Sequence, residues 1–302
     1  MSALPRTLLV CPVCGEPLTG VDRGLACPRG HRYDRARQGY VNLLTGKGSP
    51  FTGDTAGMVD AREAFLRAGH YEPLRSALVA AARTQVVSPG VILDAGAGTG
   101  YYLEGVVGAW SAAFPVALDI SKTALRRAAR ALPGGISIVW DLWRSLPLSD
   151  GSVDLLLNVF APRNPAEFAR VLAPGGCAVV VTPRPGHLAG LELVGPLLAV
   201  PEQKADDVVG AFEGLLVEVH REELDYVMTL PQDLARSALA MGPAAHHASS
   251  APSPTAPPTA ASAATSGPDT ELRVEARFTV QVLAREQPAR ASWAPAGQGT
   301  EE

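Results

Sequence analysis

The chain has 302 residues, four cysteines, a hydrophobic content of 47% and a formal net charge of −4. This length suffices for one full-sized α/β domain and a small accessory module, and for a large core without disulfides. The first residues lack a signal-peptide pattern and no apolar stretch reaches the ~20 residues of a membrane span, which argues against secreted and membrane-spanning classes. We therefore expect a cytoplasmic protein.

Residues 7–45 contain a metal-binding pattern. Turn-forming residues and short strands surround Cys-x2-Cys-x12-Cys-x3-His, formed by Cys11, Cys14, Cys27 and His31. Three thiolates and one imidazole at these spacings can close a tetrahedron around Zn²⁺, with no position left for substrate or water. The pattern predicts a structural zinc ribbon. The alternatives are unrelated free thiols and a bystander role for His31. The fourth cysteine, Cys177, is expected to be a small buried hydrophobe.

Charge is distributed unevenly between the N-terminal module and the rest of the chain. Residues 1–50, which we take as the ribbon module, carry an excess of four positive charges, and the remaining 252 residues carry −8. A zinc ion with three thiolates contributes only −1, so the positive excess survives. This asymmetry favours a phosphate-bearing partner such as RNA, although a solvated basic face would look the same. The candidate RNA contacts are Arg29, Arg32, Arg35 and Arg37.

Residues 51–89 predict a helical lead-in to a larger domain. Asp54 or Thr55 can cap a first helix, because apolar residues at helical spacing follow them. A second helical pattern ends at the breaker Ser88-Pro-Gly90.

From residue 91 onward, apolar strands alternate with helices. Strands are expected at 91–95, 114–118, 136–140, 153–158 and 177–182, and helices at 101–110, 121–131 and 165–172. This alternation predicts an α/β fold with a mostly parallel, doubly wound sheet. Ligands of such sheets bind at the C-terminal ends of the strands.

Beyond residue 182 the pattern is weaker. A helix is expected at 187–198, one or two strands at 215–229 and a short helix at 231–241. Residues 242–268 are almost wholly small residues and proline, which predicts a disordered insertion. Clean alternation over 272–283 predicts a last, antiparallel strand, so the large domain would span 90–285 and 286–302 would be a disordered tail.

The first strand of this domain leads into a glycine-rich loop, Asp94-Ala-Gly96-Ala-Gly98-Thr99-Gly100. No Gly-Lys-Ser/Thr follows, and the Gly-x-Gly-x-Gly spacing differs from the dinucleotide fingerprint. Asp119 ends the second strand, where a carboxylate can accept both ribose hydroxyls, and Asp141 ends the third, near the expected adenine amine. Together these residues favour S-adenosylmethionine (SAM) as cofactor. A structural glycine turn is the alternative.

The other candidates are weaker. Asn158-Val-Phe-Ala-Pro162 follows the fourth strand, where SAM-dependent enzymes acting on nitrogen present polar and aromatic groups to the target base. An ordinary loop with Phe160 in the core is the alternative. Asp141 or Asn158 could contact the base catalytically, but no residue is assigned as general base. Tyr71 and His187 could fold over the cofactor, or could be structural.

Taken together, these motifs resemble the 23S rRNA guanine-N1 methyltransferases of the RlmA type. The resemblance extends to about residue 245, resumes at the final strand, and is carried by the ribbon and by residues 38–44, 53–71, 93–102, 160–162 and 185–188. It implies a class I SAM-dependent methyltransferase fold. The implied zinc ligands are Cys11, Cys14, Cys27 and His31, and the implied SAM contacts are Tyr71, Gly98, Thr99 and His187.

The resemblance also implies methylation at N1 of a guanine in a 23S rRNA hairpin loop near the peptide exit tunnel. In actinomycete relatives this confers resistance to tylosin-like macrolides. The chain departs from the family pattern at Thr99, where an acidic residue is usual, and at 242–268, where relatives have an ordered, aromatic-bearing stretch. A small-molecule methyltransferase of antibiotic biosynthesis and a non-catalytic RNA-binding protein remain as alternatives. A homodimer is also open.

Overall fold

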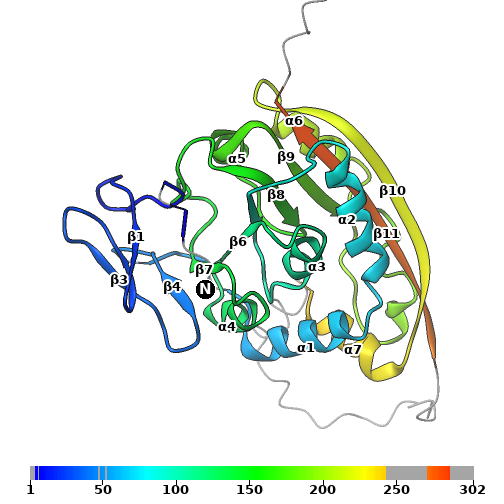
Figure 1. The fold of residues 1–302 in the computed structure, drawn as a ribbon. Helices are drawn as coiled ribbons and strands as arrows, with labels where there is room; N and C mark the ends of the chain where they lie inside the picture. Colours follow the sequence, from blue (N-terminus) through cyan, green and yellow to red (C-terminus); the bar gives the residue numbers. More distant parts are fainter. Residues whose placement is uncertain (1–3, 6, 47, 52, 243–270, 286–302) are drawn as a thin grey trace, which may run out of the picture.

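The computed structural model describes residues 4–5, 7–46, 48–51, 53–242 and 271–285 (Figure 1). Nearly all of the expected insertion, 242–268, and the whole of the expected tail, 286–302, lie outside the described residues. Within the described part of the chain, no helix is both long enough and apolar enough to cross a membrane.

An eight-stranded sheet runs through the molecule in the order β10-β11-β9-β8-β5-β6-β7-β4 (Figure 1). The neighbours from β9 to β4 pair in parallel, whereas β11 pairs antiparallel with both β9 and β10. The mostly parallel α/β sheet and its antiparallel last strand are therefore confirmed. The strands are β4 (Tyr40–Asn42), β5 (Val91–Ala95), β6 (Phe114–Asp119), β7 (Ile136–Val139), β8 (Val153–Val159), β9 (Leu172–Pro183), β10 (Val217–Leu230) and β11 (Leu272–Ala284).

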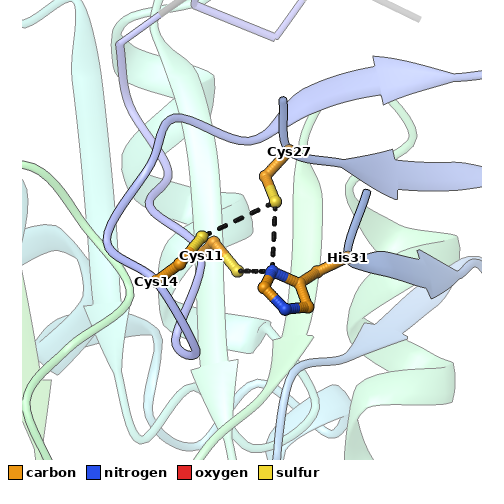
Figure 2. A group of neighbouring side chains, drawn as sticks. All are labelled: Cys11, Cys14, Cys27 and His31. Atoms are coloured by element: carbon orange, nitrogen blue, oxygen red, sulfur yellow. Dashed lines mark hydrogen bonds between the residues drawn. The ribbon is translucent and has the colours of Figure 1, made fainter. Parts of the chain in front are cut away.

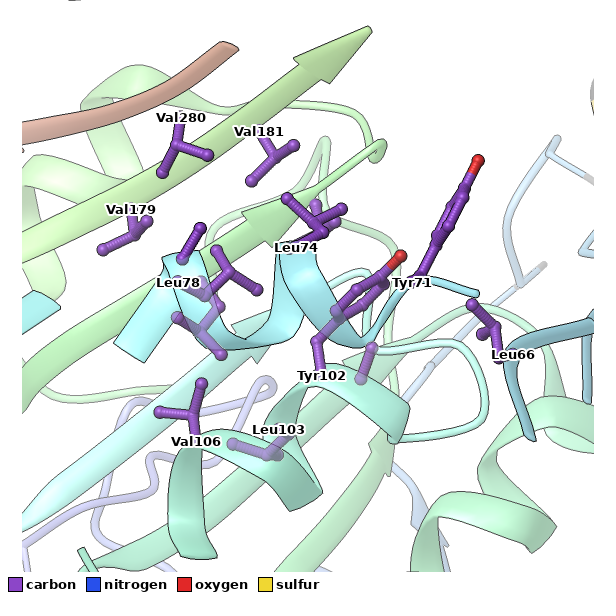
Figure 3. Packing of buried hydrophobic residues seen from close by; sticks show 14 of the residues in the cluster. Leu66, Tyr71, Leu74, Leu78, Tyr102, Leu103, Val106, Val179, Val181 and Val280 are labelled. Atoms are coloured by element: carbon purple, nitrogen blue, oxygen red, sulfur yellow. The ribbon is translucent and has the colours of Figure 1, made fainter. Parts of the chain in front are cut away.

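Helices cover both faces of this sheet. Residues of α2, α3 and α4 belong to one buried cluster, and residues of α5 and α6 belong to a second cluster on the opposite face. Figure 3 shows part of the first cluster, where Leu74 and Leu78 of α2 lie beside Val179 and Val181 of β9. The helices are α1 (Ala56–Arg67), α2 (Glu72–Arg83), α3 (Tyr101–Ala109), α4 (Lys122–Ala131), α5 (Pro165–Val171), α6 (Lys204–Ala211) and α7 (Gln232–Ala240).

One predicted helix is wrong. Residues 187–198 form turns and a single 3₁₀ turn, η1 (Leu191–Leu193). Positive φ angles at Gly186, Leu188 (66°) and Gly190 interrupt any helical run, because a right-handed helix requires negative φ throughout. Apolar spacing alone could not reveal this local geometry.

The ribbon packs onto the sheet and shares its core. Strands β1 (Thr19–Val21), β2 (Gly24–Ala26) and β3 (Arg32–Asp34) form a separate antiparallel sheet. The next strand, β4, leaves this sheet and pairs in parallel with β7. Leu9 and Leu25 of the ribbon lie in the same buried cluster as Leu93 and Ile138 of the central strands. The N-terminal module therefore extends the sheet at the edge opposite β10 (Figure 1).

Candidate functional site

The three ribbon cysteines and one histidine converge on a single point (Figure 2). Their ligand atoms all lie within 4.8 Å of one another. Cys14 Sγ is 3.7 Å from Cys27 Sγ, and His31 presents Nδ1 to Cys11 Sγ at 3.5 Å and to Cys27 Sγ at 3.3 Å. A tetrahedral zinc ion with Zn–S bonds of about 2.3 Å separates its sulfurs by about 3.8 Å. The spacing of the four donor atoms therefore fits zinc.

A neighbouring tyrosine lowers the pKa of one of the ribbon thiols. The Tyr33 hydroxyl lies 3.2 Å from Cys11 Sγ. Burial alone would raise the pKa of Cys11, but the hydrogen bonds from Tyr33 and from the backbone at Val13 and Cys14 lower it to about 6. A thiol with this pKa is largely ionised at neutral pH, as a zinc ligand must be. Tyr33 could not be recognised from the sequence, because no spacing rule marks a residue that forms a hydrogen bond to a metal-ligating atom.

The glycine-rich loop turns sharply between β5 and α3. Gly96, Gly98 and Gly100 all have positive φ angles, of 96°, 53° and 84°. A Cβ at Gly96 would lie 2.3 Å from the Cβ of Ala161, so no larger residue fits there. Backbone amides at the N-terminus of a helix favour anionic or polar ligand groups. In this structure the loop is mostly buried, and its amides donate within the protein: Gly96 N and Ala97 N to the carbonyl of Leu118, and Gly98 N to Asp119. The loop therefore holds the ends of β5 and β6 together at the carboxyl end of the sheet.

Asp94 is the most unusual group at this end of the sheet. Its side chain is 1% exposed, and neither carboxyl oxygen has a hydrogen-bond partner among the described residues. Burial, together with the nearby charge of Asp119, raises the pKa of Asp94 to about 8. Unpartnered buried carboxyls are costly and call for a cationic partner. The ammonium and sulfonium groups of SAM are cations of this kind, so the residues present fit the cofactor.

Asp119 and Asp141 follow neighbouring strands, as the sequence predicts, and both already hold backbone amides. Asp119 Oδ2 accepts from Gly98 N at 2.8 Å and Oδ1 accepts from Ser121 N at 2.7 Å. Burial raises the pKa of Asp119, although these two amides act in the opposite direction. A carboxylate oxygen has a second lone pair, so each oxygen of Asp119 can still accept a ribose hydroxyl.

Asp141 ties a distant segment to the sheet. Its Oδ1 accepts from Trp143 N at 3.0 Å, and its Oδ2 accepts from the Ser49 hydroxyl at 2.8 Å. Ser49 belongs to the segment that connects the ribbon to α1. Asp141 is only 4% exposed, so in this arrangement it acts as an anchor for that segment.

Asn158 anchors the loop after β8. Its side chain is fully buried, and Nδ2 donates to the carbonyls of Ala95 and Pro162, both at 2.9 Å. The next part of this loop is strained, since Phe160 adopts a φ of 52° while its ring remains 42% exposed. Strain of this kind in an aromatic residue is expected where the surrounding structure fixes a functional side chain. Asn158 thus fixes the loop that carries Phe160, whose ring lies partly exposed at the edge of an aromatic cluster with His187 and Phe278.

Tyr71 and His187 meet although they are 116 residues apart. Tyr71 Oη and His187 Nε2 are separated by 3.2 Å. Arg277 N donates to His187 Nδ1 at 3.2 Å, so Nε2 carries the proton and donates to Tyr71. Burial lowers the pKa of His187 to about 4, which keeps the ring neutral. Phe160 and Phe278 pack against this pair.

Arg62 also lies at this site, although no sequence motif marked it as a site residue. Its guanidinium pairs with Asp54 and donates from Nη2 to the carbonyl of Met241 at 2.9 Å. A Cβ added at Gly98 would lie 3.5 Å from Arg62 Nη1. Helix α1 therefore places a positive charge beside the glycine loop. Arg62 lies within residues 53–71, which carry part of the family resemblance. The sequence does not show which element the side chain of this arginine contacts.

Two family models match the chain. The RlmA N-terminal zinc ribbon matches residues 9–47, and a methyltransferase domain matches residues 92–176.

Curated relatives match over most of their length. A Micromonospora griseorubida protein, named among the 23S rRNA (guanine-N(1)-)-methyltransferases, is 47% identical, with coverage of 79% of this chain and 87% of the relative. The 23S rRNA (guanine(748)-N(1))-methyltransferase of Streptomyces fradiae is 44% identical, with coverage of 79% and 86%. A chain from the complex between the Haloferax volcanii Trm112 methyltransferase activator and a methyltransferase shares the fold, with a TM-score of 0.50, 16% identity and coverage of 78% and 100%.

Proposed function

The chain belongs to the RlmA-type 23S rRNA (guanine-N1)-methyltransferases, and from this premise we propose that its target is guanine 748, for which the Streptomyces fradiae relative is named. The observation that carries the proposal is the 44% identity to that relative over 86% of its length. We further propose that the ribbon, residues 1–50, recognises the RNA and that the sheet domain, residues 90–285, transfers the methyl group.

The reaction requires alignment more than proton abstraction. SAM would supply the methyl group, because its S–CH3 bond breaks and the sulfonium leaves as a neutral sulfide. Guanine N1 carries a proton at neutral pH, which it must lose as the new N–C bond forms. Asp141 accepts from Ser49 Oγ and from Trp143 N, and its Oδ2 lies 3.8 Å from the guanidinium of Arg144. Asn158 donates both amide hydrogens to backbone carbonyls, so in this arrangement both residues position loops. We assign neither residue as a base. Holding N1 in line with the methyl group supplies the rate enhancement, and the proton leaves to solvent.

The proposed cofactor contacts lie on the loops that follow β5 and β6 and on the elements that close over them. Asp94 provides the negative charge, and Asp119 provides acceptors for the ribose. The uncharged side chains of Tyr71 and His187, next to Phe278, would form the apolar wall of the proposed cofactor site. The remaining proposed contacts are Gly96, Gly98, Thr99, Gly100 and Asp141.

The target base must enter beside Phe160. A base in a hairpin loop can leave its stack at low cost and then stack on an aromatic side chain. Phe160 is exposed, and Asn158 fixes the loop that carries it. We assign Phe160 to contact with the target guanine.

Primer extension tests the proposed target directly. N1-methylguanine cannot pair, so reverse transcriptase stops at the modified position. Ribosomal RNA from a host that lacks this modification, expressing the chain, is expected to give a new stop at guanine 748, and the Asp119→Ala variant should not. A stop at another guanine would overturn the target assignment and leave the family assignment intact.

One consequence of this target and one independent prediction can be tested separately. In cells, the modification is expected to raise resistance to tylosin-like macrolides, which a minimum inhibitory concentration measures against the Asp119→Ala control. A homodimer remains a prediction that light scattering of the purified chain can check.

A further inference from the structure

Two exposed aromatic rings lie together at the junction between the ribbon and the sheet. Phe51 is 53% exposed and Trp143 is 56% exposed, and their ring centroids are 6.4 Å apart. Phe51 comes from the segment after the ribbon, and Trp143 comes from the loop after β7. Rings that remain this exposed gain little from folding, so their pairing requires another explanation.

Polar contacts, and not burial of the rings, hold this pair in place. The buried carboxylate of Asp141 accepts from Trp143 N on one oxygen and from the Ser49 hydroxyl on the other. Ser49 Oγ in turn accepts from Phe51 N at 3.1 Å. The guanidinium of Arg144 donates to the carbonyl of Gly48. One buried anchor therefore positions both aromatic residues before any ligand arrives.

The surroundings of the pair suit a nucleic acid. The ribbon that precedes Phe51 carries an excess of positive charge. Arg144, in the same loop as Trp143, is 36% exposed at its side chain and lies 3.8 Å from the carboxylate of Asp141. Arg144 also lines a cavity of about 360 Å³ between this loop and the zinc knuckle. Trp140, which is 4% exposed, lines the same cavity, and its Nε1 has no hydrogen-bond partner among the described residues.

We propose that Phe51 and Trp143 form a stacking platform for an unpaired base of the substrate RNA, next to the target guanine, with Arg144 facing its phosphate. Aromatic platforms bind bases through their π-faces and tolerate any base, so they add affinity without reading sequence. The inference rests on the proposed function, because it takes the RNA as given and names how a second nucleotide is held.

Binding of a 23S rRNA hairpin at several salt concentrations tests the platform. Phe51→Ala and Trp143→Ala are each expected to weaken RNA binding about tenfold to a hundredfold. The log–log salt slope should stay unchanged, since stacking releases no counterions, whereas Arg144→Ala should lower it by roughly 0.7 to 0.9. Trp143→Phe should restore most of the affinity. Val87→Ala, at a 90% exposed valine, is the matched surface control.

A second readout separates the RNA from the cofactor. The dissociation constant for SAM should be the same in the wild-type chain and in both aromatic variants. Weaker SAM binding with unchanged RNA binding would show that the pair covers the adenine of the cofactor and would overturn the inference. Unchanged affinity for both ligands would also overturn it.

Failure of this inference and failure of the proposed function are distinguishable. Wild-type chain that methylates another guanine, or none, contradicts the proposed target whatever the aromatic variants do. Wild-type chain that methylates guanine 748 while the aromatic variants bind RNA equally well contradicts only the platform.

Discussion

Binding of SAM should release a proton from Asp94. This carboxyl is buried without a hydrogen-bond partner, and burial, with the charge of Asp119, raises its pKa to about 8. In the free protein at pH 7 it is therefore about nine-tenths protonated. The two cations of SAM favour the ionised form, so its pKa falls in the complex. We expect uptake of SAM at pH 7 to release close to one proton.

The magnitude follows from the pKa of the free protein. Ionising Asp94 costs about 1.4 kcal/mol at pH 7 and about 2.7 kcal/mol at pH 6, because each unit of pKa corresponds to 1.36 kcal/mol. The dissociation constant for SAM should therefore fall about tenfold between pH 6 and pH 7. Above about pH 8 the gain ends, since Asp94 is then ionised and the ammonium of SAM begins to lose its own proton.

Titration calorimetry in buffers of different ionisation enthalpy measures the released protons. The matched variant is Asp94→Asn, which keeps the shape of the side chain and removes its titration. This variant should bind SAM more weakly at pH 8, with no proton release attributable to residue 94 and a flatter pH dependence. Equal proton release from wild-type chain and Asp94→Asn, or none from the wild type at pH 7, would refute the reasoning.

Four further outcomes are expected. Asp94→Asn should raise the melting temperature of the free protein at pH 8 far more than at pH 3, because a raised pKa destabilises the fold only where the unfolded carboxyl is ionised; equal gains at both pH values would contradict this. Cys27→Ser should lose zinc, measured by metal analysis, and should lower the melting temperature of the whole chain, because the ribbon and the sheet share one core. An unchanged melting curve would contradict that coupling. Asp119→Ala should cost about 2–3 kcal/mol of SAM binding, roughly a hundredfold, and an unchanged dissociation constant would place the ribose elsewhere. Alanine at all four ribbon arginines should lower the salt slope of RNA binding by roughly 0.7 to 0.9 per lost contact without changing SAM affinity, and an unchanged slope would remove the ribbon as the RNA contact; the positions are Arg29, Arg32, Arg35 and Arg37.

The zinc ligands and the central sheet could be predicted because both leave signals that are local in sequence. Cys11 and Cys14 sit on one turn and Cys27 and His31 on another, so the ligand spacing is dictated by the knuckles themselves. The strands of a parallel sheet are buried on both faces, which leaves continuous apolar runs such as 91–95.

Contacts between distant segments left no such signal. The strand β4 has only three residues, and its pairing with β7 depends on how the ribbon docks. A division of the chain at residue 50 follows the change in composition, but the hydrogen bonds to β7 begin at residue 40. The contact between Ser49 and Asp141 spans 92 residues. Hydrophobic patterns and motifs describe one segment at a time, so they do not predict contacts between residues far apart in the sequence.

The segment between the ribbon and α1 explains why the two modules act together. After β4, Ser49 is fixed to Asp141, and the Ser121 hydroxyl donates to the carbonyl of Asp54 at 3.3 Å. Thr55 then caps α1, accepting from Met58 N at 3.3 Å, and α1 carries Arg62 to the glycine loop. The contacts of Ser49 and Asp54 tie the segment to the loops after β7 and β6, and Arg62 lies beside the loop after β5. These are the loops at the carboxyl end of the sheet, where the cofactor is expected to bind. The segment that leaves the ribbon is therefore held by the same loops that carry the proposed cofactor contacts Asp119 and Asp141, which couples the ribbon to that end of the sheet.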